Sequence, residues 1–100
     1  MKVNVNAVNF TADKKLVDFI QERIDKLEKF YGKIVTADVF LKVEKTSEKE
    51  NKIVEVKIHV PGDDFMVKKQ CKTFEEAVEL SAESLERILV KRKEKINAHI

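Results

Sequence analysis

Hydrophobic and polar residues alternate along four segments of the chain, a pattern that is typical of strands with one buried face. The segments are residues 1–7, 34–45, 53–60 and 65–71. In the third segment, Val54 and Val56 would share one face while Lys57 lies on the other. Residues 61–64, Pro-Gly-Asp-Asp, form a strong turn signal before the last segment, and the polar residues 46–52 indicate a hairpin-type loop before the third. The pattern therefore predicts four strands.

Two further segments repeat apolar residues at spacings of three and four, which indicates amphipathic helices. The first helix would place one set on its buried side: Leu16, Ile20, Ile24, Leu27 and Tyr31. Thr11 or Asp13 would cap this helix and Gly32 would end it. The second helix would begin at Thr73, which forms a capping box with Glu76. Its core face would contain Phe74, Ala77, Val78, Ser81, Leu85, Ile88 and Leu89.

The predicted order of elements is β-α-β-β-β-α, which places the chain in the α+β class. The simplest packing puts the two helices on one face of a four-stranded, mostly antiparallel sheet. We expect residues 1–100 to form a single domain, because 100 residues can bury enough surface to fold alone. The helices and strands would share one core that includes Leu27, Val39, Leu41, Val54, Val56, Ile58 and Leu85.

Composition narrows the possible functions. The chain has 38% charged residues but a net charge of only +2, so attraction to nucleic acid would depend on local grouping of cations. One cysteine excludes an internal disulfide, and neither a signal peptide nor an apolar membrane-spanning run is visible. We expect a soluble cytoplasmic protein that does not contact membranes and is monomeric when free.

Signals of catalysis are poor. Gly32 and Gly62 are the only glycines, so the chain has no glycine-rich phosphate loop. His59 precedes two aspartates across a turn, but two distant histidines without a cysteine cluster do not make a convincing metal site. Cys71 has no histidine nearby in sequence to activate it. We predict no enzymatic activity, catalytic residue, cofactor, bound metal or small-molecule substrate.

The last 28 residues separate acidic from basic side chains. Every charged residue from 73 to 86 is a glutamate, whereas nearly all from 87 to 95 are basic. Acidic residues near the start of a helix and basic residues near its end interact favourably with the helix dipole. This effect explains the order of the charges along the helix axis. Arg87, Lys91 and Lys95 also share one stripe of the helix, which the dipole does not explain. Such a ridge of cations can bind a row of phosphates.

The first helix carries a second basic ridge. Lys15, Lys26, Lys29 and Lys33 fall on a similar side of a helical wheel, with Arg23 nearer the apolar boundary. Two such ridges on adjacent helices would make a basic groove. The solvated face of the sheet would carry several further cations, including Lys42, but with Phe40 almost alone there, base stacking by the sheet is weak.

The chain resembles the ribosome hibernation-promoting factors and ribosome-associated translation inhibitors, in their short form. The resemblance rests on the joint order of several segments rather than on one motif. They are Met1–Val5, Arg23–Tyr31, Val39–Lys45, Phe74–Glu79, Leu85–Arg87 and Lys91–Lys95. One departure is Thr73-Phe74-Glu75, where the family often has Asp-Met-Tyr.

This resemblance implies a partner and a mechanism. Members of the family bind the small ribosomal subunit in the channel between head and body, and they inhibit translation in stationary phase or stress. The resemblance implies that basic side chains of the helices contact ribosomal RNA, with Lys42 as a further candidate. The candidate RNA-binding residues are Arg23, Lys26, Lys29, Lys42, Arg87, Lys91, Arg92, Lys93 and Lys95.

Two alternatives remain from the residues themselves. The run Lys68-Lys69-Gln70-Cys71-Lys72 resembles the basic entry to the last helix of a generic double-stranded-RNA-binding domain. Against that reading, Glu75, Glu76 and Glu79 crowd the first turns, where phosphate would lie. The other alternative is a protein-interaction module without a role in RNA binding, which would use Phe40 and mixed charges. Binding that persists in high salt would favour it.

Overall fold

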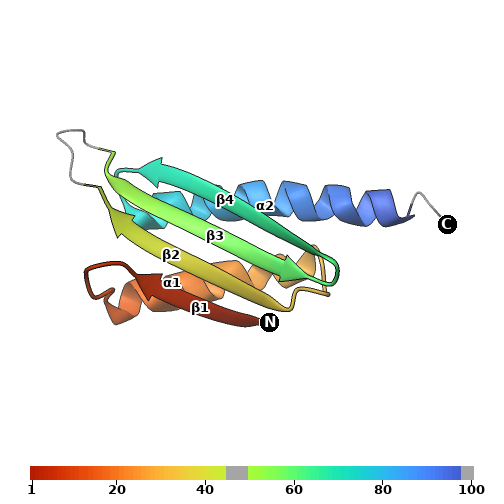
Figure 1. Ribbon diagram of the computed structural model, residues 1–100, viewed down its shortest axis with the longest axis horizontal. Coiled ribbons are helices and arrows are strands. Elements are labelled where there is room, and N and C mark those ends of the chain that lie inside the picture. The colour runs from red at the N-terminus through yellow and green to blue at the C-terminus, as the bar shows by residue number, and fades with distance from the viewer. Residues whose placement is uncertain (45–49, 98–100) are drawn as a thin grey trace.

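The computed structural model describes residues 1–44 and 50–97, with side chains to Glu94 in the last helix. Its element order is β1 (Lys2–Ala7), α1 (Lys14–Asp25), the 3-10 helix η1 (Lys26–Lys29), β2 (Thr36–Val43), β3 (Lys52–Val60), β4 (Asp63–Cys71) and α2 (Phe74–Asn97). Figure 1 shows both helices on one face of the sheet, with α2 extending beyond it. The predicted α+β order β-α-β-β-β-α is confirmed. The predicted loop at residues 46–52 lies largely outside the described residues.

The four strands lie in the order β1-β2-β3-β4. β1 pairs with β2 in parallel, in a register that aligns Val5 with Val39. The other neighbours are antiparallel, with Val39 opposite Val56 and Val56 opposite Val67. A parallel first pair needs a crossover, and α1 with η1 supplies it. The sheet is therefore mostly antiparallel, as the alternation predicted.

Alternation along the strands separates a helix-covered face of the sheet from an open face. On the covered face, Val39, Leu41, Val54, Val56 and Ile58 are fully buried. Ile20, Ile24 and Leu27 of the first helical segment and Leu85 and Leu89 of α2 complete the same core. All seven core residues expected from the sequence are fully buried. Burial of this apolar area is the main term that stabilises the fold.

The ends of the elements follow local chemistry. Asp13 is the residue that caps α1, because its carboxylate accepts a hydrogen bond from the Leu16 amide at 3.0 Å. Thr73 caps α2 by accepting from the Glu76 amide at 3.2 Å, which is half of the predicted capping box. Pro61 and Gly62 make the turn between β3 and β4, where Gly62 adopts a φ of 82°.

The first helix differs from the prediction at its end. The spacing of apolar residues indicated one helix to Tyr31 that ends at Gly32, but the α-helix ends at Asp25 and continues as η1 to Lys29. Both the Phe30 and the Tyr31 amides donate to the Leu27 carbonyl oxygen, which tightens the last turn. Leu27 and Tyr31 remain in the core. The tighter turn moves Lys29 from the position that a regular α-helical wheel assigns to it.

Candidate nucleic-acid interface

Exposed cations lie on both helical segments that cover the sheet. η1 contributes Lys26 and Lys29, and α2 contributes Arg87 and Lys91. We call these four residues the seam surface. η1 contacts α2, so the two pairs belong to neighbouring elements. Cations on two rigid elements can neutralise phosphates without ordering a loop.

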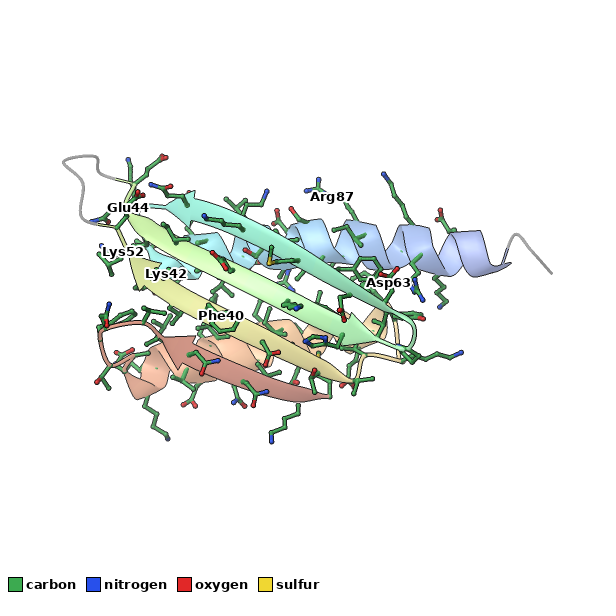
Figure 2. The ribbon with its side chains drawn as sticks, in the orientation of Figure 1. Phe40, Lys42, Glu44, Lys52, Asp63 and Arg87 are labelled. Atoms are coloured by element: carbon green, nitrogen blue, oxygen red, sulfur yellow. The ribbon has the colours of Figure 1, made fainter. Side chains whose placement is uncertain are left out.

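The seam surface borders a shallow hollow of about 390 Å³. Its lining includes Arg87 and Lys91, with Phe30 and Val90 as the apolar part. Glu86 and Glu94 also line it. The lining therefore combines two cations, two carboxylates and an apolar part. Figure 2 shows Arg87 projecting from α2 at the edge of the molecule, on the side of α2 that lies away from α1 in this view.

Arg23 is engaged within the fold. Its Nε lies 2.8 Å from Glu79 Oε1, and its Nη2 lies 2.9 Å from Glu86 Oε1. The Arg23 side chain is only 13% exposed. Desolvation acts to lower the pKa of the guanidinium, but the hydrogen bonds to both glutamates outweigh it and the pKa is raised. Arg23 therefore links α1 to α2, and it presents little of its charge to a ligand.

Arg92 is also engaged within the fold. Its guanidinium carbon lies 6.0 Å from the centroid of the Tyr31 ring and 5.6 Å from that of Phe65. It donates to Asp63 Oδ2 at 3.0 Å and to the Pro61 carbonyl oxygen at 3.2 Å. Its hydrogen bond to the Tyr31 hydroxyl raises the pKa of Arg92. This side chain ties α2 to the turn between β3 and β4.

The other candidate cations are dispersed. Lys93 is exposed on α2, and the backbone of Lys95 belongs to α2 while its side chain lies outside the described residues. Lys42 is exposed on β2 next to the buried Leu41, so it lies on the open face of the sheet, away from the helices (Figure 2). Lys42 and the seam surface consequently do not form one continuous site.

A chain of polar contacts crosses the open face of the sheet. The side-chain amide of Asn4 donates to Asp38 Oδ1 at 3.0 Å. The two ring nitrogens of His59 lie 3.1 Å from Asp38 Oδ2 and 2.7 Å from Asp64 Oδ1. Hydrogen bonds to Asp64 and then Asp38 raise the pKa of His59, while the bond from Asn4 is the largest cause of the lowered pKa of Asp38. We call these four residues the cross-sheet relay. They were not predicted to interact.

The described residues offer little for catalysis. Among them, no three His, Cys, Asp or Glu side chains are grouped to hold a metal ion. Cys71 is buried, and desolvation raises its pKa, which disfavours the reactive thiolate. Phe74, the departure in the last helix, is buried and stacks on Phe10 with ring centroids 5.4 Å apart. No helix among these residues is long and apolar enough to cross a membrane.

Comparison with known proteins identifies the family. Residues 3–97 match the model of the family described as Sigma 54 modulation protein / S30EA ribosomal protein. The chain belongs to this family. The match includes every strand and helix except the first residue of β1. The resemblance seen in the sequence is therefore confirmed.

Relatives within this family have related names. A ribosome hibernation promoting factor from Azotobacter vinelandii is 30% identical over 95 residues, which cover 95% of this chain and 85% of the relative. A protein of the same name from Klebsiella oxytoca is 27% identical over 99% of this chain and 100% of the relative. The ribosome hibernation promotion factor of Bacillus subtilis is 28% identical over 97% of this chain, but only 51% of that relative is covered.

Solved structures confirm the fold of the family. A ribosomal subunit interface protein from Coxiella burnetii superimposes with a TM-score of 0.83 at 17% identity, covering 93% of this chain and 98% of that one. The N-terminal domain of Thermus thermophilus Protein Y gives a TM-score of 0.78 at 15% identity, covering 91% and 98%. At such identities the likeness is one of backbone fold.

Proposed function

We propose that this chain is a ribosome hibernation factor that binds the small ribosomal subunit and inhibits translation sterically. The observation that supports the proposal is the seam surface, a set of exposed cations on two contacting elements, in a chain whose relatives are named ribosome hibernation promoting factors. The factor would be a cytoplasmic protein, monomeric when free, that acts in stationary phase or stress. It carries out no chemical reaction in this role.

The seam surface acts by neutralising phosphates of ribosomal RNA. Its four cations would replace counterions along the RNA backbone, and the contact between η1 and α2 links the two pairs. Lys93 and Lys95 extend the same helix and would add peripheral contacts. Arg23 and Arg92 support this surface by holding α2 in place, so their contribution to RNA binding is indirect.

The alternatives are less well supported. A double-stranded-RNA-binding domain would use the basic run 68–72 at the start of the last helix, where Glu75 and Glu76 occupy the first turn. In the structure β1 is a full member of the sheet, which disagrees with that module. A protein-interaction module that uses Phe40 would not require exposed cations on both helical segments.

Salt dependence of binding to the isolated small subunit tests the mechanism. Four phosphate contacts predict a loss of affinity of about 50- to 150-fold between 50 and 200 mM salt, from a slope of roughly −0.7 to −0.9 per contact. We expect co-sedimentation with the small subunit at low salt and release at high salt. Binding that is indifferent to salt, or that requires only the large subunit, contradicts the proposal.

Charge reversal on α2 tests the site. Arg87→Glu and Lys91→Glu should each weaken small-subunit binding tenfold or more with little change in Tm, because both side chains are exposed. Glu83→Lys is the matched control, since Glu83 is exposed on the same helix and in no ion pair among the described residues. Glu79 is unsuitable as a control because it pairs with Arg23. Full inhibition of in vitro translation by the Arg87→Glu, Lys91→Glu double variant would refute the proposed site.

A further inference from the structure

A hollow opens at the end of the sheet, where β1 stops before β2. The Val8 amide still donates to the Leu41 carbonyl oxygen at 2.9 Å, and the chain then turns toward α1 through Asn9, whose φ is 63°. Asn is among the few residues that adopt this left-handed conformation readily. The space left between the turn and the end of β2 has a volume of about 630 Å³. Its lining residues are Val8, Asn9, Phe10, Lys42 and Val43, and we call it the sheet-end hollow.

The apolar part of the sheet-end hollow is preformed. Val8 and Val43 are large hydrophobic residues that remain 37% and 45% exposed. Phe10 is held from behind, because its ring stacks on Phe74 with an interplanar angle of 10°. Phe74 is itself in the core. A ligand would therefore meet a fixed apolar surface rather than a side chain that must first be ordered.

The polar part of the hollow favours an anionic ligand. Lys42 is exposed at its rim, and none of the five lining residues is acidic. The Asn9 side chain supplies both a hydrogen-bond donor and an acceptor. Phe40 is half-buried on the same strand and the same open face as Lys42, as Figure 2 shows. Two segments more than 30 residues apart in the sequence therefore bring apolar walls, an amide and one cation together.

An unpaired nucleotide has the complementary groups. Proteins recognise unpaired bases by stacking and by hydrogen bonds to base edges, with cations on the backbone. The hollow is within the usual volume range of small-ligand sites, about 300–1,000 Å³. We propose that the sheet-end hollow binds one unpaired nucleotide of an RNA strand. The base lies against Val8, Phe10 and Val43, Asn9 contacts the base edge, and the phosphate lies at Lys42.

This second RNA contact rests on the proposed function, because that function makes RNA the ligand, but it is separate from the seam surface. The hollow lies over Phe74 at the start of α2, whereas Arg87 is 13 residues further along that helix. At 1.5 Å per residue the two places are about 20 Å apart. The proposal also explains how Lys42 can contact RNA from the opposite face of the sheet.

The test is an NMR titration of methyl-labelled protein at 50 mM salt with hexauridylate, a single-stranded probe, and separately with a short RNA duplex. We expect hexauridylate to shift the Val8 and Val43 methyl signals, and the duplex to leave them unchanged while it shifts Val90 beside the seam surface. Lys42→Ala should weaken hexauridylate binding at the hollow by three- to tenfold. Lys68→Ala is the matched control, an exposed lysine on the open face in β4 that does not line the hollow, and it should have no effect.

Two further variants separate the hollow from the seam surface. Val43→Asp places a negative charge in the apolar wall at an exposed position, so it should abolish the shift at Val8 without unfolding the protein. The Arg87→Glu, Lys91→Glu variant should keep the Val8 and Val43 shifts even if it no longer binds the small subunit. Unshifted Val8 and Val43 signals at saturating hexauridylate overturn the proposal, as do equal effects of Lys42→Ala and Lys68→Ala. Equally strong shifts with hexaglutamate would also overturn it, since the hollow would then be a general anion site.

Discussion

Replacing Arg23 with methionine tests whether this arginine holds the helices together or binds RNA. Methionine keeps much of the aliphatic stem and removes the guanidinium, so both ion pairs to α2 are lost while the packing is largely retained. The structure predicts that Arg23→Met lowers the stability of the free protein. It also predicts that affinity for the small subunit stays within about threefold of the wild type, since Arg23 contacts glutamates rather than solvent.

The size of the stability loss follows from the exposure of the three groups. A hydrogen bond between charged groups contributes about 1.5–3 kcal/mol when buried, whereas an exposed ion pair contributes about 0.2–1 kcal/mol. Glu79 is 44% exposed, so its pair belongs near the lower range, while Glu86 at 24% exposure is intermediate. We expect a combined loss of about 1–2 kcal/mol. For a chain of this length that corresponds to a fall in Tm of roughly 5–15 °C.

Thermal and urea unfolding of single and combined variants measure this loss. A double-mutant cycle that combines Arg23→Met with the Glu79→Gln, Glu86→Gln pair should show a coupling energy of about 1 kcal/mol. The reason is that the two glutamates no longer stabilise the fold once their arginine partner is removed. Small-subunit affinity is measured on the same proteins at a temperature well below the lowest Tm. An unchanged Tm together with a tenfold or greater loss of affinity would show that Arg23 acts on RNA and refute this reasoning.

Three further predictions concern the stability of the free protein. The raised pKa of His59 means that the stabilising contribution of the cross-sheet relay is complete below the ordinary histidine value of 6.5 and is lost as pH rises through the folded-state pKa. Urea unfolding at pH 5.5 and 8.5 should therefore differ less for His59→Gln than for wild type, and an equal difference would contradict this. Gly62→Ala should lower the free energy of unfolding by about 1–2 kcal/mol, measured by thermal unfolding. The loss comes from the φ of 82° alone, because an added Cβ would have no neighbour within 4 Å. Gly62→Asn should recover part of the loss, because Asn adopts this conformation more readily. Leu85→Ala, at a fully buried site, should lower the free energy of unfolding by about 2–5 kcal/mol. Leu80→Ala, at a site that is 40% exposed, should lower it by under about 1 kcal/mol. Similar Tm values for the two variants would contradict the assigned core.

Periodicity was sufficient to predict the architecture because it reports which side of each element is buried. The buried positions Val54, Val56 and Ile58 follow directly from the alternation in β3. It was not sufficient at the end of α1, because the change to a 3-10 turn depends on how Leu27 and Tyr31 enter the core. A regular helical wheel contains no information on that tertiary constraint.

The candidate site was predictable in its residue types but not in its pairings. Charge sorting on α2 identified Arg87 and Lys91, which the structure places in the open. The candidate residues from the first helix included Arg23, whose partners are 56 and 63 residues away in the sequence. Contacts at that separation depend on which faces of two elements meet. The sheet-end hollow was missed for the same reason, since β1 and β2 must be aligned before it exists.

The contacts that two arginines make within the fold have a consequence for how the protein would dissociate from RNA. The chain has three arginines, and two of them, Arg23 and Arg92, are held in contacts within the fold. Its phosphate contacts would therefore be made mostly by lysine ammonium groups, which are strongly hydrated point charges without the two-pronged geometry of guanidinium. Such contacts exchange readily with other cations. A rise in free magnesium or polyamine would be expected to speed dissociation without unfolding or degrading the factor, so that one molecule could be released and used again.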